Sequence, residues 1–437
     1  MRQRYSIALG FLILIAFGAL LLASPWARNE GTWGGWGNAF FTAFSSVCVT
    51  GLSVVDIAAE YSRTGQIILL CLVEIGCLGL MTCGTFLLIA IGRRLSLSRE
   101  FSLMNAYGVE QVQGLRGLIC WVVGSMLFFE ALGVAAYYVR LDDLYLSVFY
   151  SIMSFCNAGF SILPGSLAAF ADDPYLVVVS ALLTIAGGIG FLVIYNLCTF
   201  KFLRRKSGAK GRLSLHSSIV LKFSLGLIVI AFAVFLVSEW NWALKEYAWG
   251  QKLWVALYQA VTPRSCGFTV IPLENLRLST IGLYEGLMFI GGAPGSVAAG
   301  IKVTTLAVLV CTILAMCRGE SETVISNRVI SYDVVRESIV IVVALLILEN
   351  VVYGLLLATE PNAEASSLRL GFEAISAITT TGLSVGDTTA NLSPVGRVVI
   401  MCAMFLGRLG ALTVVLMIGS RESKRLVRYP SEELVVG

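Results

Sequence analysis

A short glycine motif occurs four times in the sequence and fixes how the chain is organised. Each copy reads small residue, glycine, leucine or phenylalanine, serine or threonine, then valine or isoleucine. The copies are Thr50-Gly51-Leu52-Ser53-Val54, Ala158-Gly159-Phe160-Ser161-Ile162, Cys266-Gly267-Phe268-Thr269-Val270 and Thr381-Gly382-Leu383-Ser384-Val385. Their glycines lie 108, 108 and 115 residues apart. Such near-even spacing indicates a fourfold internal repeat, so the chain is expected to fold as four similar units.

The sequence between these motifs is far more apolar than that of a soluble protein. Of 437 residues, 57% are hydrophobic and only 13% are charged, whereas charged residues make up about a quarter of a soluble domain. About 20 consecutive apolar residues span a bilayer as a helix. The long apolar runs are Ile7–Ala23, Ile67–Ile91, Leu118–Tyr138, Leu176–Leu197, Ile219–Val237, Thr304–Met316, Ile339–Leu357 and Val398–Ile418. The sequence therefore predicts an all-α polytopic membrane protein embedded in the lipid bilayer.

Each repeat has three parts: a spanning run, a shorter run that ends at the repeated glycine, and a second spanning run. The spanning runs cover about 5–24 and 64–92, 116–138 and 174–200, 217–238 and 281–317, and 333–358 and 394–419. The middle runs are too short to cross the bilayer and are expected to be re-entrant; they are Trp36–Val49, Asp143–Asn157, Gln251–Arg264 and Ser367–Thr380. We therefore expect eight transmembrane helices and four re-entrant half-helices, in repeats covering 1–110, 111–212, 213–325 and 326–437.

Basic residues between the repeats orient the chain, because cytoplasmic loops carry an excess of Lys and Arg. The connections and the C-terminal segment hold Arg93, Arg94, Arg99, Arg116, Lys201, Arg204, Arg205, Lys206, Lys210, Arg212, Arg318, Arg328, Arg336, Arg421, Lys424, Arg425 and Arg428. The opposite loops hold fewer cations and many acids. Both termini are therefore expected in the cytoplasm, with the glycine turns near the outer face. Binding of nucleic acid or acidic lipid is the alternative interpretation of the basic loops, and we expect no nucleic-acid partner.

A second motif, Gly-x-x-Gly, begins 25, 28, 25 and 25 residues after the turn glycines. Its copies are Gly76-Cys77-Leu78-Gly79, Gly187-Gly188-Ile189-Gly190, Gly292-Ala293-Pro294-Gly295 and Gly407-Arg408-Leu409-Gly410. In repeat three the surrounding segment, Gly291–Lys302, clusters glycines with a proline, which breaks a helix. Broken backbone at membrane depth is tolerated only inside protein or beside water. In repeat four Arg408 lies within a spanning run, where a charge normally faces a cavity or a partner; snorkelling to an interface is the alternative.

The eleven cysteines lie in or beside the apolar runs, with no CxxC pair and no His-Cys cluster. This pattern predicts small buried hydrophobes rather than a disulfide framework or a metal site. Glu74 is a second charge within a spanning run. Two interpretations of Glu74 remain: it pairs with a residue of a neighbouring helix, or it lies close to a polar pore.

Four equivalent turns that converge on one axis can bind a cation. Half-helices that end at the turns point their partly negative C-terminal ends inward. Turn carbonyls can replace the hydration shell of a cation, as in potassium filters, and glycine permits the backbone conformations that this requires. We therefore expect an ion-binding filter around one pseudo-fourfold central pore, formed by Val49, Thr50, Gly51, Asn157, Ala158, Gly159, Ser265, Cys266, Gly267, Thr380, Thr381 and Gly382.

This helix–pore-loop–helix plan resembles the Trk/Ktr/HKT superfamily of potassium transporters, most closely the bacterial KtrB-type membrane subunit, over essentially the whole chain. The resemblance is carried by Val47-Cys48-Val49-Thr50-Gly51-Leu52, Asn157-Ala158-Gly159-Phe160, Gly291-Gly292-Ala293-Pro294-Gly295-Ser296 with Gly300-Ile301-Lys302, and Gly407-Arg408-Leu409-Gly410. The chain departs from the family pattern at Pro263 and Cys266 beside the third filter turn, and at Val297 and Ala299 in the broken segment.

The resemblance implies potassium uptake across the bacterial cytoplasmic membrane, with one pore per subunit of a homodimer. It implies that the segment 291–302 is an intramembrane gate below the filter. The implied gate residues, with the arginine that helps to hold the gate closed, are Gly291, Gly292, Pro294, Gly295, Ser296, Gly300, Lys302 and Arg408. It also implies a cytosolic KtrA-like ring of RCK subunits that binds the nucleotide, and stimulation of uptake by sodium. No cofactor is expected in this chain, and potassium, with sodium as a second ion, is the substrate.

Two transporter alternatives remain beside this hypothesis. An alternating-access cation symporter would be built from inverted repeats around a closed midplane site, whereas all four turns here are expected on one side. A sodium-selective relative is the other, although the family resemblance implies that glycine at all four filter positions favours potassium. An enzyme is not expected, because the single histidine, His216, lies in a basic connection and no P-loop or GxGxxG motif occurs.

Overall fold

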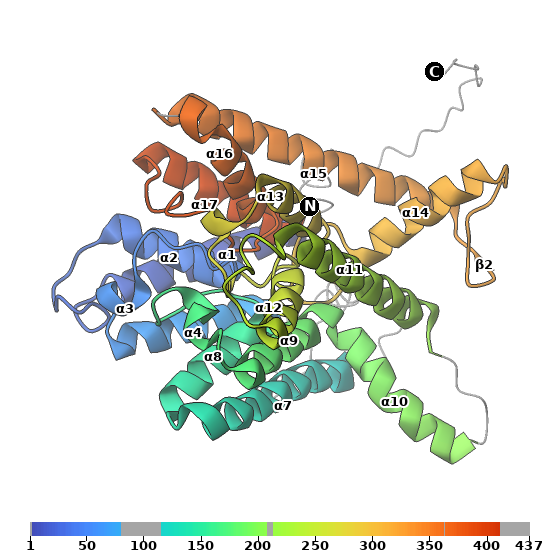
Figure 1. Cartoon of the computed structure of the whole chain (residues 1–437), viewed down its shortest axis with the longest axis horizontal. Coiled ribbons are helices and arrows are strands. Elements are labelled where there is room, and N and C mark those ends of the chain that lie inside the picture. The colour runs from blue at the N-terminus through green and yellow to red at the C-terminus, as the bar shows by residue number, and fades with distance from the viewer. Residues whose placement is uncertain (1, 80–114, 208–212, 362, 411–437) are drawn as a thin grey trace.

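A computed structural model gives the fold of residues 2–79, 115–207, 213–361 and 363–410 (Figure 1). Over these ranges the chain is mostly helical. One hairpin departs from the all-α expectation: β1 (Val324–Ile325) pairs antiparallel with β2 (Arg328–Val329). Its turn residues, Ser326 and Asn327, have φ values of 50° and 63°, as a tight two-residue hairpin turn requires.

The helices recur in the order expected from the repeats. The first helix of each repeat is α1 (Arg2–Leu22), α7 (Leu115–Leu141), α11 (Leu215–Glu239) or α15 (Tyr332–Thr359). The helix before each turn is α2 (Trp36–Cys48), α8 (Leu144–Cys156), α12 (Trp249–Val261) or α16 (Ala363–Ile378). The helix after each turn is α4 (Arg63–Leu78), α9 (Pro174–Ile189), α13 (Leu278–Phe289) or α17 (Pro394–Leu409). Further helices are α3 (Ile57–Glu60), α10 (Phe191–Ser207), α14 (Val303–Cys317), and the short 3-10 helices η1 (Ser166–Phe170) and η2 (Leu273–Asn275).

The four repeats follow one another around a common centre. In each repeat the first helix packs on the helix before the turn, as in the pairs α1–α2 and α7–α8. The helix after the turn then packs on the pre-turn helix of another repeat: α4 on α8, α9 on α12, α13 on α16 and α17 on α2. Since the last contact returns to repeat one, the contacts close a ring. In Figure 1 the colour accordingly passes around the molecule from blue through green and olive to orange and red.

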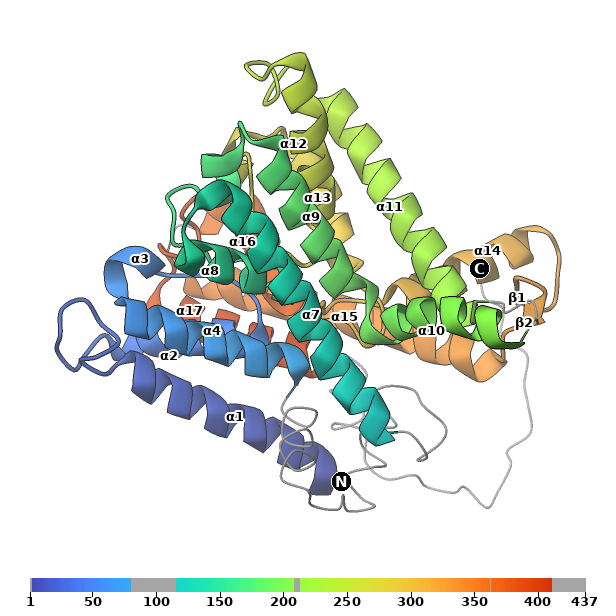
Figure 2. The same ribbon diagram turned by 90° about the horizontal axis from the view of Figure 1, so that it is seen from below.

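Among the described residues, three helices are long and apolar enough to cross a membrane: Ile119–Leu141, Leu215–Glu239 and Tyr332–Thr359. A fourth span results if Pro174–Ile189 and Phe191–Thr199, which meet at an angle of 94°, are counted as one. Figure 2 shows α10 turning away from α9 at this junction. The expectation of one continuous helix over about 174–200 is therefore wrong.

The break follows from the last glycine of the Gly-x-x-Gly motif. Gly190 ends α9 at φ 93° and ψ 140°, a conformation that side chains penalise and glycine tolerates. Gly79 and Gly410 end α4 and α17 at φ 75° and 84°, with nearly the same ψ. The remainders of the runs expected to continue to 92 and 419 lie outside the described residues. In repeat three, no helix covers 290–302, between α13 and α14.

Candidate functional site

The four turn glycines lie in one closed ring. A Cβ atom on each of them would collide with the turn of another repeat, so no side chain fits. The clashes would be Gly51 with the Ala158 carbonyl oxygen at 2.1 Å, Gly159 with the Gly267 Cα at 2.8 Å, Gly267 with the Thr381 carbonyl oxygen at 2.8 Å, and Gly382 with the Thr50 carbonyl oxygen at 1.9 Å. The contacts run from repeat one through two, three and four and back to one, so the structure brings all the sequence-predicted filter segments together.

The backbone adopts the same unusual conformation in all four turns. The turn glycines have φ values of 93°, 66°, 82° and 83°. The residues two positions earlier are also left-handed, with φ between 46° and 81°: Val49, Asn157, Ser265 and Thr380. A β-branched residue in this region is a genuine outlier, and such a residue costs about 1–3 kcal/mol. Repetition of this conformation in four places indicates that the surrounding fold imposes it.

Helix-ending hydrogen bonds direct three of the turns in the same way. The residue before each turn glycine donates its N–H to a carbonyl five residues earlier, a Schellman-type bond: Thr50 to Ser45 at 2.8 Å, Ala158 to Met153 at 3.0 Å and Thr381 to Ser376 at 2.9 Å. Repeat three differs, because α12 already ends at Val261 and Cys266 donates to the Thr262 carbonyl.

Pro263 explains this departure, since proline has no N–H to continue the helix. The carbonyl oxygen of Gln259, four residues before Pro263, instead accepts from the Tyr284 hydroxyl at 2.7 Å. The Cys266 thiol lies 3.2 Å from the Thr184 hydroxyl and 3.3 Å from the Tyr258 hydroxyl. The third turn thus reaches the ring with a different set of supporting contacts.

Several polar atoms of the turns are buried without a hydrogen-bond partner in the described part of the chain. They are the hydroxyls of Thr50 and Thr380 and both amide atoms of Asn157. Buried polar atoms are nearly always satisfied by protein or ordered water. Their gathering at the ring therefore fits a site that takes up water or an ion.

The Gly-x-x-Gly motif supports the turns from behind. In three repeats its first glycine packs on the carbonyl oxygen four residues before the turn glycine. A Cβ would lie 2.2 Å from the Val47 oxygen at Gly76, 2.0 Å from the Phe155 oxygen at Gly187, and 1.8 Å from the Ile378 oxygen at Gly407. The two motifs are therefore in contact, and the first glycine is required by this close approach. In repeat three, a Cβ on Gly292 would meet Ala298 Cβ at 2.7 Å instead.

The predicted gate segment forms a loop with a hydrogen-bonded neck. Gly291 donates its N–H to the Ile301 carbonyl at 3.0 Å, and Val303 donates to the Gly292 carbonyl at 3.1 Å. A Cβ on Gly291 would lie 1.7 Å from the Ala299 carbonyl oxygen. Gly295 and Gly300 have φ values of 69° and 74°. The clustered glycines thus permit both the tight neck and the turns of the loop.

The loop is held against the break in repeat two. Ala293 donates to the Gly188 carbonyl at 3.0 Å, and Phe191 donates to the Gly295 carbonyl at 3.1 Å, on either side of Pro294. Within the loop, the Ser296 hydroxyl donates to the Ala293 carbonyl at 2.6 Å and the Lys302 ammonium to the Ala298 carbonyl at 2.5 Å. The loop therefore packs against the break between α9 and α10. The sequence did not predict this break.

Arg408 connects this loop to two other repeats. From α17, its guanidinium donates to the Val297 carbonyl at 2.6 Å and to the carbonyl of Gly76 at the end of α4. The head group lies among backbone carbonyls inside the protein, so snorkelling to an interface does not describe it.

Arg264 is a second basic residue at this loop, and the sequence interpretation gave it no role. Its guanidinium donates to the Ser224 carbonyl at 3.3 Å and to the Gly291 carbonyl at 3.4 Å. It also lines a mainly apolar cavity of about 400 Å³ between α9, α11 and α12. Because Ser265 follows directly, Arg264 joins the third turn to the neck of the loop. Its signal in the sequence was a charge that directly precedes the third turn, at the end of the run Gln251–Arg264.

Glu373 was also missed. This carboxylate in α16 is fully buried and accepts from the Ser384 hydroxyl at 2.8 Å and from the Thr389 hydroxyl. It lies nine residues before Gly382, and Tyr150, which occupies the same position in repeat two, contacts the Ser161 hydroxyl at 2.8 Å. Alignment of the four pre-turn runs would have revealed it, because repeat four alone has an acid at this position.

Known proteins resemble this chain over almost its full length. Residues 10–429 match the family TrkH, described as a cation transport protein. The chain is 33% identical over 440 residues to the Ktr system potassium uptake protein B of Bacillus subtilis (strain 168), covering 99% of this chain and 96% of the relative. It is 31% identical over 442 residues to the potassium/sodium uptake protein NtpJ of Enterococcus hirae, covering 99% of this chain and 96% of the relative.

One solved structure has a similar fold. The crystal structure of the potassium transporter TrkH from Vibrio parahaemolyticus matches with a TM-score of 0.74 and covers 94% of this chain and 84% of that chain. At 16% sequence identity, this likeness concerns the fold alone.

Proposed function

The chain belongs to the TrkH family of cation transport proteins, and we propose that it is the ion-translocating membrane subunit of a Ktr-type potassium uptake system. The family resemblance inferred from the motifs is confirmed, and the relatives are transporters rather than enzymes. Potassium is the substrate in this proposal, since the Bacillus subtilis and Enterococcus hirae relatives are both named for potassium uptake.

The ion pathway in this proposal passes through the ring of four turns. The single observation that carries it is the closed set of contacts from Gly51 through Gly159 and Gly267 to Gly382. Carbonyl oxygens of the turns replace the hydration shell of the ion, and the C-terminal ends of the pre-turn helices add a favourable negative potential. The unpartnered hydroxyls of Thr50 and Thr380 are further oxygen ligands or water contacts.

The remaining architecture follows from the same proposal. The pre-turn helices α2, α8 and α12, each 13 residues long, and the 16-residue α16 are re-entrant half-helices, because about 20 residues are needed to cross the membrane. Eight crossings then surround one central pore in the bacterial cytoplasmic membrane. Both termini lie in the cytoplasm, on the side of the basic connections.

The loop 290–302 is the gate of this pathway. Hydrogen bonds from the other three repeats support this proposal. Ala293 and Gly295 of the loop bond to the repeat-two break at Gly188 and Phe191. Arg408 of repeat four bonds to the loop at Val297 and to Gly76 of repeat one. These ties hold the loop in a closed arrangement, and their release opens the pore.

Partners and the second ion are proposed from the family resemblance. The subunit functions as a homodimer and is regulated by a cytosolic KtrA-like ring of RCK subunits, which binds the nucleotide. Sodium stimulates uptake. The Enterococcus hirae relative is named a potassium/sodium uptake protein, and this name supports a role for sodium.

The name of this relative also suggests a second candidate function, in which sodium is the transported ion. Sodium would then move through a sodium-selective pore or by cation symport. The two candidates differ in the ion that moves. In a potassium uptake system, sodium raises potassium flux without itself accumulating, whereas in the alternative sodium enters in proportion to its own gradient. Isotopic sodium and rubidium uptake, measured on the same cells, separates these outcomes.

Expression in a bacterium that lacks its own potassium uptake systems tests the proposal. We expect growth at low potassium and uptake of rubidium, a potassium substitute, to be restored by the wild-type chain together with an RCK partner. Gly226→Ser is a matched control for glycine substitutions, because no atom lies within 4 Å of a Cβ placed there. Absence of uptake, with the protein present in the membrane, would contradict the proposal.

A further inference from the structure

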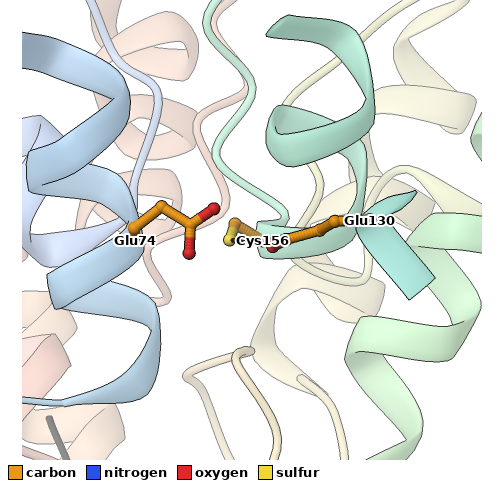
Figure 3. Close-up of side chains that lie close together, drawn as sticks. All are labelled: Glu74, Glu130 and Cys156. Atoms are coloured by element: carbon orange, nitrogen blue, oxygen red, sulfur yellow. Dashed lines mark hydrogen bonds between the residues drawn. The ribbon is translucent and has the colours of Figure 1, made fainter. Parts of the chain in front are cut away.

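Three side chains with metal-binding atoms meet behind the second turn. Glu74 on α4, Glu130 on α7 and Cys156 at the end of α8 bring two carboxylate oxygens and one thiol within 4.8 Å of one another. Figure 3 shows Glu74 pointing from one side towards Cys156 and Glu130 on the other.

Neither carboxyl group forms an ion pair in the described part of the chain. The ion pairs found there all involve Arg28 or Arg140 and none involves Glu74 or Glu130. Glu130 is 5% exposed and Cys156 is fully buried, whereas Glu74 is half-buried. Their carboxyl oxygens lie within 4.8 Å of each other, and two carboxylates that share a site do not both ionise without a cation. Charged groups at membrane depth are costly and mark functional sites, so this cluster of metal-binding atoms is a candidate cation site.

We propose that Glu74, Glu130 and Cys156 form a binding site for a zinc-type divalent cation. Thiolate and carboxylate together select a borderline-soft metal such as zinc or cadmium over magnesium and calcium, which prefer oxygen alone. Zinc holds carboxylate oxygens and cysteine sulfur at about 2.0–2.3 Å. Tetrahedral ligands at these distances lie about 3.3–3.8 Å from one another, so atoms that are up to 4.8 Å apart need to approach one another by at most about 1.5 Å.

Binding exchanges protons for the metal ion. The proton shared by the two carboxyl groups and the proton of the Cys156 thiol both leave to solvent, because the ligands must be deprotonated. Two carboxylates and one thiolate then carry three negative charges against the two positive charges of the ion. The half-buried side chain of Glu74 provides the approach to the site.

The site is connected to the ion pathway at two points. Cys156 directly precedes Asn157, the left-handed residue of the second turn. Glu74 lies two residues before Gly76, whose carbonyl accepts from Arg408. Drawing Cys156 and Glu74 towards one ion would move the start of the turn and the end of α4, so a bound metal lowers flux. This consequence rests on the proposed function, whereas the metal site itself does not.

Cadmium binding to the purified full chain tests the site without any transport assay. Thiolate-to-cadmium charge transfer absorbs in the ultraviolet and reports the Cys156 bond directly. We expect one saturable tight site per chain, unaffected by excess magnesium, and at least about a tenfold loss of affinity in Cys156→Ser and in Glu130→Gln. Cys402→Ser, which removes an exposed cysteine on α17, is the matched control and retains the tight site.

Two results would overturn the site: wild-type protein without saturable cadmium binding, or Cys156→Ser and Glu130→Gln that bind as tightly as wild type. Glu130→Gln is nearly isosteric, so it carries the test if Cys156→Ser fails to fold. Rubidium flux in liposomes then tests the connection, with cadmium lowering flux in wild type and Cys402→Ser but not in Glu130→Gln. If wild type binds cadmium tightly but its rubidium flux is unchanged, the proposed effect of the metal on transport is wrong, while the metal site itself stands.

Discussion

Arg408 on α17 donates to the carbonyl oxygen of Val297 at 2.6 Å, and so fixes the loop of repeat three to repeat four. The same guanidinium binds the Gly76 carbonyl of repeat one. One side chain therefore holds three repeats together at the place where the fourfold pattern is broken. Selection and control are thus separable in the proposal: ions are selected by residues that match across the repeats, and flow is controlled by residues that do not.

Arg408→Ala is expected to raise potassium flux. A hydrogen bond to a charged group contributes about 1.5–3 kcal/mol, and about 1.4 kcal/mol changes an equilibrium tenfold. Loss of the tie should therefore increase the open fraction by about tenfold or more, measured as rubidium flux in liposomes. Arg328→Ala, at the exposed strand β2, is the control. Flux that falls while the amount of membrane-inserted protein is unchanged would rule out this role.

Shortening the loop between Gly291 and Gly300 is expected to raise flux for the same reason. Deleting residues at its tip removes the bonds at 3.0 and 3.1 Å to Gly188 and Phe191. Because the deletion and Arg408→Ala release the same loop, their effects on flux should be less than additive. Full additivity of the two changes in the double variant would show that they act on different steps.

Gly187→Ala is expected to destabilise the protein. Its Cβ would lie 2.0 Å from the Phe155 carbonyl oxygen at the end of α8, and overpacking of this kind costs about 1–3 kcal/mol or more. Thermal unfolding of the purified protein in detergent should show a clear loss for Gly187→Ala and none for Gly226→Ala, where the space is open. Equal unfolding temperatures would contradict the close approach of the two motifs.

Glu373 is expected to act as a positioning residue for the fourth turn. Glu373→Ala removes the carboxylate that accepts from the buried Thr389 hydroxyl and the half-buried Ser384 hydroxyl, a loss of about 1–3 kcal/mol, whereas Glu373→Gln keeps an oxygen for one of them. Competition of sodium against rubidium uptake should therefore shift strongly in Glu373→Ala and weakly in Glu373→Gln. A lower protein amount with an unchanged sodium-to-rubidium ratio would indicate only a structural role.

The spacing of motifs predicted which segments meet, because four copies of one unit in a ring must place equivalent residues near one axis. The convergence of Gly51, Gly159, Gly267 and Gly382 follows from that spacing. The sequence was less informative about where a helix ends. Hydropathy alone reads 174–200 as one run, and only the left-handed backbone at Gly190 separates α9 from α10.

The sequence did not predict which side chains of different helices contact one another. Glu74, Glu130 and Cys156 lie on three helices of two repeats, and apolar runs without a clear polar face do not show which side chains will meet. Cysteine spacing along the chain therefore gave no sign of this cluster. Arg264 and Glu373 could have been found, since each is one of only two charges in its pre-turn run.

The central claim is that the ring of turns selects the ion, and flux through glycine variants tests it most directly. Rubidium and sodium uptake should be compared for wild type, Gly51→Ser, Gly267→Ser and the control Gly226→Ser at matched membrane levels. We predict that Gly226→Ser behaves as wild type, while the two turn variants lose rubidium flux and preference for it over sodium, because a Cβ at Gly51 would lie 2.1 Å from the Ala158 oxygen. Unchanged rate and ion preference in both turn variants would contradict the account.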